Sequence, residues 1–129
     1  MSTPVSGSPR MLLRLEALAV LIAAVMGYRA LGASWLLFAV VLLLPDISLA
    51  GYLGGPRVGA TVYNVFHTYL APALVGAIAY ATASRTAWAL CLIWIAHIGM
   101  DRALGIGLKF PSAFRDTHLG AVGKAAPAT

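Results

Sequence analysis

Most residues that could carry chemistry lie in one stretch near the end of the chain, from Trp94 to Gly120. The stretch begins as an apolar helix and then collects several titratable or charged side chains: His97, Asp101, Arg102, Lys109, Arg115, Asp116 and His118. Only 10% of the 129 residues are charged, so this is a strong local concentration. We therefore ask which polar groups elsewhere in the chain could join it.

Two pairs of polar residues have spacings that place both members on one helix face. His97 and Asp101 are four residues apart, and Asn64 and His67 are three apart. Asp46 lies late in another apolar run. An Asp at the centre of a membrane helix costs roughly 2.5–3.5 kcal/mol, so such residues usually face the protein interior and find partners there. We expect these five side chains to converge.

Imidazoles and carboxylates together suit a divalent metal ion, such as Zn, Mn or Fe. A metal ion with an open coordination position can activate water. Arg102 and Lys109 could hold an anionic headgroup. The predicted site has three metal ligands (His67, His97 and His118), two catalytic carboxylates that could also bind the metal (Asp46 and Asp101), and three binding residues (Asn64, Arg102 and Lys109).

A structural interpretation of the same residues stays open. His and Asp side chains can hydrogen-bond between helices and only orient them, at about 0.6 kcal/mol per bond. Asp101 could pair with a neighbouring base at the membrane interface. Glu16 is expected to pair with Arg14 or another nearby base rather than to join the site.

The composition indicates a membrane protein. Hydrophobic residues make up 60% of the chain, whereas soluble domains are about 45–50% apolar and about 25% charged. The net charge is +5, but the basic residues are scattered singly at the ends of apolar runs, which argues against a nucleic-acid partner. The single cysteine, Cys91, excludes an intramolecular disulfide.

Four apolar runs are long enough to cross a bilayer, which takes about 20 residues per helix. The predicted fold class is all-α, a four-helix transmembrane bundle with an interfacial or re-entrant C-terminal segment. One membrane domain is expected at 11–120, between a disordered N-terminus at 1–10 and a disordered tail at 121–129. Its helices are predicted at about 11–28, 34–53, 63–81 and 87–104, and the segment 105–120 is expected to bring His118 over the site.

The basic residues predict the orientation in the membrane. Four spans place Arg29 and Arg85 on one side and the other seven basic residues on the opposite side: Arg10, Arg14, Arg57, Arg102, Lys109, Arg115 and Lys124. Both termini are therefore predicted to be cytoplasmic, in a multi-pass protein of the cell (inner) membrane. The polar site would lie at the cytoplasmic end, in contact with the lipid bilayer, and homo-oligomerisation stays open.

Four segments carry a resemblance to a known family: YLGGPRVGA, YNVFH, WIAHIGMDRALGIGLKF and FRDTHLG. They resemble a family of small bacterial integral membrane proteins defined as domain of unknown function 4260, over roughly residues 12–120. The resemblance implies a multi-span membrane protein and supplies no activity. More loosely, Pro45-Asp46, His97 and Thr117-His118 are similar to a pattern in small inner-membrane proteins proposed as metal-dependent hydrolases.

The residues and the resemblance together favour one function and leave others open. The first hypothesis is a metal-dependent hydrolase acting on a lipid or other amphipathic substrate. A second is a non-enzymatic binding protein or an ion- or proton-coupled transporter, for which the far halves of the helices offer few ionisable groups. A third is a structural membrane component.

Overall fold

The protein is helical over most of its length in a computed structural model, which describes residues 2–123. This confirms the predicted all-α class. Two very short strands near the end of the chain form the antiparallel sheet of the described part. The elements in chain order are α1 (Gly7–Leu31), α2 (Trp35–Val41), the 3-10 helix η1 (Leu44–Gly54), α3 (Pro56–His67), α4 (Leu70–Thr82), α5 (Arg85–Ala103), β1 (Asp116–Thr117) and β2 (Gly120–Ala121).

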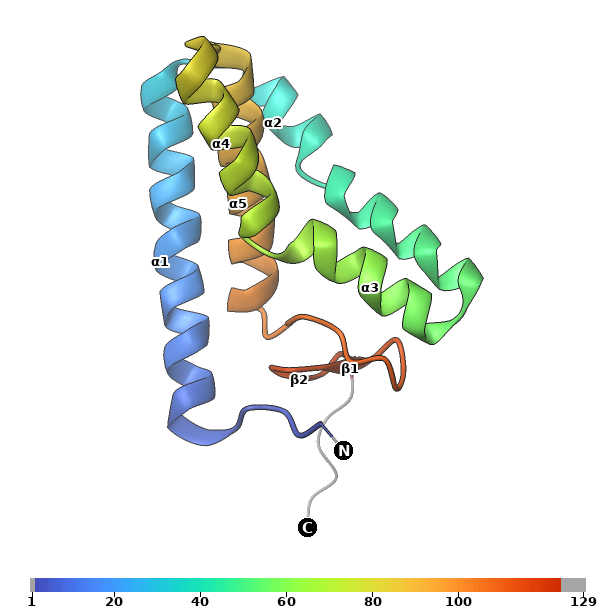
Figure 1. Cartoon of the computed structure of the whole chain (residues 1–129). Coiled ribbons are helices and arrows are strands. Elements are labelled where there is room, and N and C mark those ends of the chain that lie inside the picture. The colour runs from blue at the N-terminus through green and yellow to red at the C-terminus, as the bar shows by residue number, and fades with distance from the viewer. Residues whose placement is uncertain (1, 124–129) are drawn as a thin grey trace.

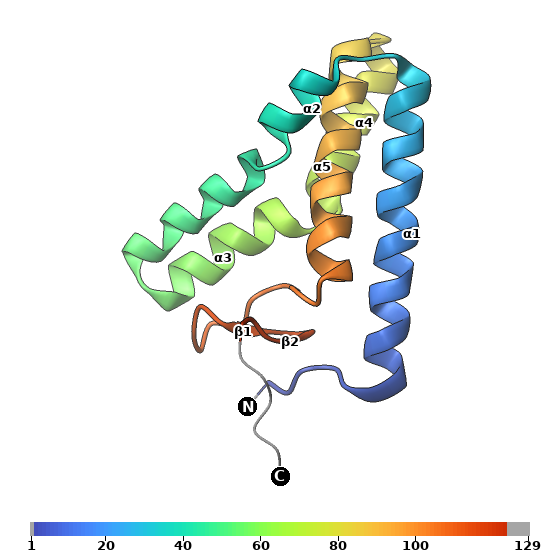
Figure 2. The ribbon, with the colours of Figure 1, turned by 180° about the vertical axis from the view of Figure 1, so that it is seen from behind.

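The helices form an upright group and an arm. Figure 1 shows α1, α4 and α5 upright, with α5 packed against both of the others. After α1, the chain leaves this upright group through α2. The next two helices, η1 and α3, run side by side as an arm that leans away from the group (Figure 2). The hairpin of β1 and β2 lies beyond the end of α5, beneath the arm.

Small residues allow α1 and α5 to pack closely. Ala17 and Ala24 of α1 are buried, as are Ala96 and Gly99 of α5. A Cβ added at Gly99 would lie 3.0 Å from the Ala17 carbonyl oxygen, which cannot move without shifting the backbone of α1. Close backbone approach through small residues is a common way for helices to pack in membranes. Because α1 covers this face of α5, the arm meets α5 on a different face.

Two prolines divide helices that the sequence predicted to be continuous. A proline cannot donate to the carbonyl four residues earlier, and its ring clashes with that carbonyl. Accordingly, α2 ends at Val41, four residues before Pro45. Thr68, four residues before Pro72, is extended with φ −94° and ψ 146°, and it separates α3 from α4. The predicted helices at 34–53 and 63–81 are therefore each built in two pieces.

The two ends of the described chain contact each other. Helix α1 begins at Gly7, four residues before the predicted start, and the segment before it is held by Val5, whose N–H donates to the carbonyl of His118 (2.7 Å). Near the other end, Ala121 lies in β2. Most of the tail that was predicted to be disordered, residues 124–129, lies outside the described residues.

Three helical segments of the described chain are long and apolar enough to cross a membrane: Gly7–Leu31, Trp35–Gly54 and Pro56–Thr82. Large apolar side chains on them point outward, including Leu36, Leu53 and Leu70. Many large apolar side chains exposed on apolar helices are typical of proteins in contact with lipid. These features indicate a membrane protein. The fourth predicted span, α5, carries Asp101 and Arg102 in its last turn and is the most buried of the helices.

Candidate metal centre

Four of the predicted side chains meet where the arm joins α5: Asp46, His67, His97 and Asp101. One donor atom from each lies within 4.8 Å of all the others. Nε2 of His97 is 3.2 Å from Asp46 Oδ1 and 3.2 Å from Asp101 Oδ2. Nε2 of His67 is 3.2 Å from Asp46 Oδ1 and 3.6 Å from Asp101 Oδ2. The two imidazole Nε2 atoms are 3.1 Å apart.

These separations match the edges of a metal coordination tetrahedron. Zinc binds His nitrogen at about 2.0–2.1 Å and carboxylate oxygen at about 2.0–2.2 Å, usually with tetrahedral geometry. Donors at those bond lengths lie about 3.3–3.5 Å from each other. The observed values of 3.1–3.6 Å cover five of the six edges. The four residues could therefore hold one divalent ion without rearranging the helices.

The orientation of the His67 ring supports metal binding. Its Nδ1 donates a hydrogen bond to the carbonyl of Tyr63 (2.9 Å). Its ring also stacks on that of Tyr63, with ring centroids 3.7 Å apart and 8° between the planes. In the neutral ring, the lone pair is then on Nε2 and points at the other three side chains. A carbonyl or carboxylate that fixes the far nitrogen is the usual companion of a metal-bound histidine. On His97, by contrast, Nδ1 is buried without a hydrogen-bond partner among the described residues.

The charge of the four side chains suits a cation, and their burial leaves the group open on one side. If both carboxylates are ionised and both imidazoles neutral, the group has a net charge of −2, which would suit a divalent cation. The side chains of His97 and His67 are 0% and 3% exposed, and that of Asp101 is 12% exposed. Asp46 is the exception, at 39%. Solvent or substrate would therefore approach the group past Asp46.

The two proline breaks and one helix face position these four residues. Asp46 directly follows Pro45 in the first turn of η1, and His67 is the last residue of α3, next to the extended Thr68. His97 and Asp101 lie one turn apart on α5, as their spacing predicted. Two donors thus come from the arm and two from α5. Broken helices buried against other protein segments are common places for polar sites in membranes.

The structure does not bring His118 into this group. Nδ1 of His118 accepts the N–H of Leu108 (2.8 Å), inside the C-terminal segment. A Cβ on Gly107 would lie only 2.4 Å from that Nδ1, so a glycine is needed opposite the ring. Burial and the nearby charge of Arg102 lower the pKa of His118. Its contacts position the C-terminal segment.

Asn64 also lies outside the four-residue group. It binds both backbone groups of Lys109: Nδ2 donates to the carbonyl (2.9 Å), and Oδ1 accepts the N–H (2.7 Å). This contact joins the C-terminal segment to α3. The same segment reaches the metal centre through Ile106 and Gly107, which border a small depression beside His67 and Asp101.

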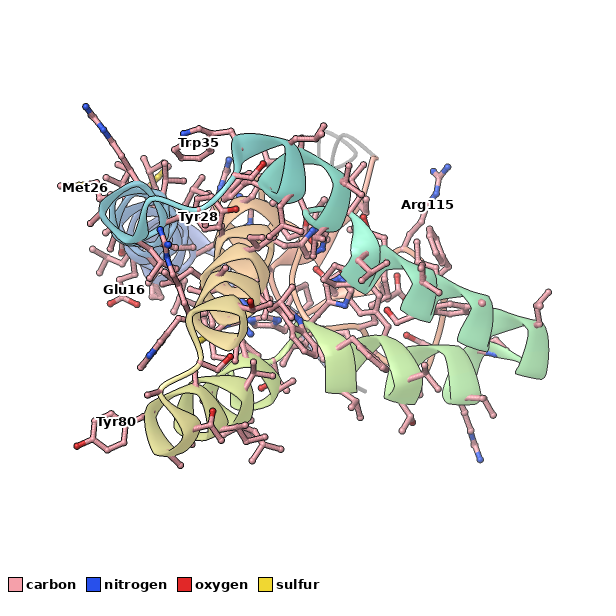
Figure 3. The ribbon with its side chains drawn as sticks, turned by 90° about the horizontal axis from the view of Figure 1, so that it is seen from above. Glu16, Met26, Tyr28, Trp35, Tyr80 and Arg115 are labelled. Atoms are coloured by element: carbon pink, nitrogen blue, oxygen red, sulfur yellow. The ribbon has the colours of Figure 1, made fainter. Side chains whose placement is uncertain are left out.

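The predicted cationic residues have partners within the protein. Lys109 is 5% exposed, its Nζ donates to the carbonyl of Phe114 (2.7 Å), and burial lowers its pKa. The guanidinium of Arg102 lies over the ring of Tyr69 at 4.6 Å and donates to the carbonyl of His67 (3.3 Å). Glu16 is exposed and points away from the body of the protein (Figure 3).

Sequence reasoning missed two features beside the centre. One is Tyr63, whose carbonyl and ring position His67; its place one turn before a histidine in a helix was the available signal. The other is a partly open cavity of about 230 Å³ between the arm, α4 and α5, lined by apolar side chains. No pattern of spacing indicated it, because its walls come from five separate helices.

The fold and the centre define a class: a helical protein with membrane-spanning potential and a buried group of two His and two Asp that could hold a metal. Residues 10–122 match the family described as Domain of unknown function (DUF4260), so the chain belongs to that family. Comparison with curated proteins and with solved structures finds no match.

Proposed function

We propose that this protein is a multi-pass protein of the cell (inner) membrane, with both termini cytoplasmic, that binds a divalent metal ion (Zn, Mn or Fe) and hydrolyses an amphipathic substrate. The observation that carries the proposal is the arrangement of the four donor atoms, at the spacing of a coordination shell and next to apolar, outward-facing helices. A site at such a junction can reach both the polar and the apolar part of a lipid-like molecule.

The exposures of the four side chains suggest how they divide the work. His67, His97 and Asp101 are the three buried donors and would hold the ion. A bound divalent ion can lower the pKa of a coordinated water to about 7. Asp46, on the open side, would then accept the proton of the attacking water and later give it to the leaving group. Three protein ligands with one further position is the usual composition of catalytic zinc sites.

Metal analysis of the purified protein tests this proposal. The chain has three histidines, two in the centre and one outside it, so His118→Ala is a matched control for His97→Ala and His67→Ala. Each protein is loaded with the ion and then dialysed to remove the excess free ion. We expect stoichiometric metal in wild type and in His118→Ala, and none in the other two variants. Gel filtration and thermal unfolding would show that each variant is folded. Metal-free wild type, or equal metal content in all four proteins, would reject the proposal.

A structural role for the same four residues is the second candidate. The distances of 3.2 Å between imidazole nitrogens and carboxylate oxygens also suit direct ion pairs of protonated histidines. Such pairs would hold the arm against α5, and the four residues would then have no catalytic role. In that case a double-mutant cycle on Asp46 and His97 would show coupling in unfolding free energy, and that coupling would be unaffected by chelators or added metal.

The proposed orientation has its own test. Reporter fusions at the two termini should both be active in the cytoplasm. An extracytoplasmic C-terminus would place the metal centre toward the other side of the membrane and would contradict the proposed orientation.

A further inference from the structure

Three residues that line the apolar cavity lie close in the chain to residues of the metal centre. Two of its lining residues, Pro45 and Phe66, each precede a residue of the centre in the chain, namely Asp46 and His67. A third, Trp94, lies one turn before His97 on α5. The remaining lining residues come from α2, η1, α4 and α5. The cavity wall is therefore built from neighbours in the chain of three of the four donor residues, while none of the four donors itself lines the cavity.

The chemistry of the walls defines what the cavity can bind. Every lining side chain is apolar or aromatic. The only side-chain N–H among them, Nε1 of Trp94, already donates to the carbonyl of Phe66 (2.7 Å). A polar ligand would thus lose its hydrogen bonds to water and gain none, which is costly. An alkyl chain has no such penalty, since its burial is favourable.

The size of the cavity suits part of an alkyl chain. An apolar cavity of roughly 150 Å³ is enough to bind benzene, and this one measures about 230 Å³. Two of the helices that line it, α2 and α4, belong to segments apolar enough to lie in the membrane. An acyl chain could therefore enter from the hydrocarbon of the bilayer without crossing water.

We propose that the cavity binds the acyl chain of the substrate, so that the acyl carbonyl at the end of the chain lies at the metal centre. The substrate class is then a long-chain ester or amide, and this assignment rests on the proposed function. Water adds to the carbonyl carbon, the bond from that carbon to the ester oxygen or amide nitrogen breaks, and the alcohol or amine leaves with the proton that Asp46 took from the water. The products are a fatty acid and the free alcohol or amine.

Alkyl hydroxamates of increasing length test whether one molecule occupies the metal centre and the cavity together. The hydroxamate group chelates the ion, and the alkyl chain extends from it. We expect the affinity for metal-loaded wild type, measured by competition with a chromogenic chelator, to rise about fourfold for each added methylene until the cavity is full. Val75→Phe, which fills the cavity, should remove this dependence on length.

The control is Leu74→Phe, the neighbouring residue on α4, which is 65% exposed and does not line the cavity. Because all proteins share one detergent, partitioning of the longer hydroxamates into micelles cancels in the comparison. Leu90→Phe is a second cavity-filling variant in case Val75→Phe fails to fold. A length dependence that is equal in wild type, Val75→Phe and Leu74→Phe would overturn the inference while leaving the metal proposal intact.

A second measurement requires no metal. Trp94 lines the cavity, so a brominated fatty acid bound there should quench its fluorescence, taken as the difference between wild type and Trp94→Phe in lipid nanodiscs. We expect quenching that saturates with added fatty acid in wild type and Leu74→Phe, and that is lost in Val75→Phe. Saturable quenching in a protein that binds no metal would support the cavity and reject the proposed function. Linear, unsaturable quenching in all variants would reject the cavity as a binding site.

Discussion

Two polar regions of this protein each contain a buried or half-buried histidine, and they differ in what those histidines contact. In the C-terminal segment, His118 accepts a backbone N–H, and Asn64 binds the two backbone groups of Lys109. In the centre, His67 and His97 face each other and two carboxylates through their Nε2 atoms. The polar side chains of the first region pair with backbone groups, whereas those of the second direct their donor atoms at a single point.

The difference separates structural polar groups from a candidate ligand set. A side chain that hydrogen-bonds the backbone satisfies groups that would otherwise be unpaired on burial. Four titratable side chains that direct their donor atoms at one point satisfy no backbone group there and need a shared cation, either protons or a metal ion. The C-terminal segment should therefore matter for stability, and the centre should matter for metal binding.

The largest expected effect concerns the carboxylates. Asp101→Asn removes a charged donor from the centre, and we expect the affinity for a divalent ion to fall by more than about 100-fold, beyond the effect of losing a supporting hydrogen bond. The matched control is Asp116→Asn in the C-terminal segment, where the carboxylate accepts from Ser112 (2.6 Å) near the surface. Isothermal titration of the metal-free proteins would measure both. Equal affinities for the two variants would remove the distinction between the regions.

The next largest effect concerns Asn64. Asn64→Ala leaves the backbone N–H and carbonyl of Lys109 without their partners, and we expect the unfolding free energy to fall by about 1–3 kcal/mol. Urea unfolding in mild detergent would measure this. Asn64→Asp retains the acceptor oxygen and should fall between the two. Metal content should stay at the wild-type level, and its loss from folded Asn64→Ala would place this residue in the centre.

The smallest effect is a pH dependence from His118. Burial and the charge of Arg102 lower its pKa in the folded state below the ordinary value of about 6.5. The unfolded chain therefore binds more protons near that pH, and the stability that the neutral ring contributes is present above about pH 6.5 and lost as the pH falls toward the folded pKa. His118→Asn can accept from Leu108 without titrating. Wild type should therefore lose more stability than this variant between pH 7.5 and about 5.5, and parallel curves would contradict the assignment.

The convergence of the centre could be predicted from the sequence for a physical reason. Asp46, His67, His97 and Asp101 interrupt apolar helices, where an unpartnered ionisable group is costly, and the four-residue spacing put His97 and Asp101 on one face. The all-α class followed from the lengths of the apolar runs. The membrane orientation and the catalytic roles stay predictions.

The remaining features depend on contacts that spacing does not encode. Pro45 and Pro72 are visible in the sequence, but the lengths of the apolar runs predict continuous helices, and only the structure shows that each proline divides its helix four residues earlier. The surroundings of His118 could not be predicted either, because they depend on how an irregular segment pairs its own backbone. Periodicity describes helix faces, whereas backbone pairing in a loop leaves no periodic trace.

The division of the four donors between the arm and α5 links ligand binding to mechanical integrity. Asp46 and His67 belong to the arm and His97 and Asp101 to α5, so an ion held by His67 from one side and by His97 and Asp101 from the other would act as a removable cross-link between them. Anything that binds the folded state alone stabilises it by an amount that grows with free ligand concentration. Depletion of the ion would then loosen the arm while the packing of α1 on α5 persists.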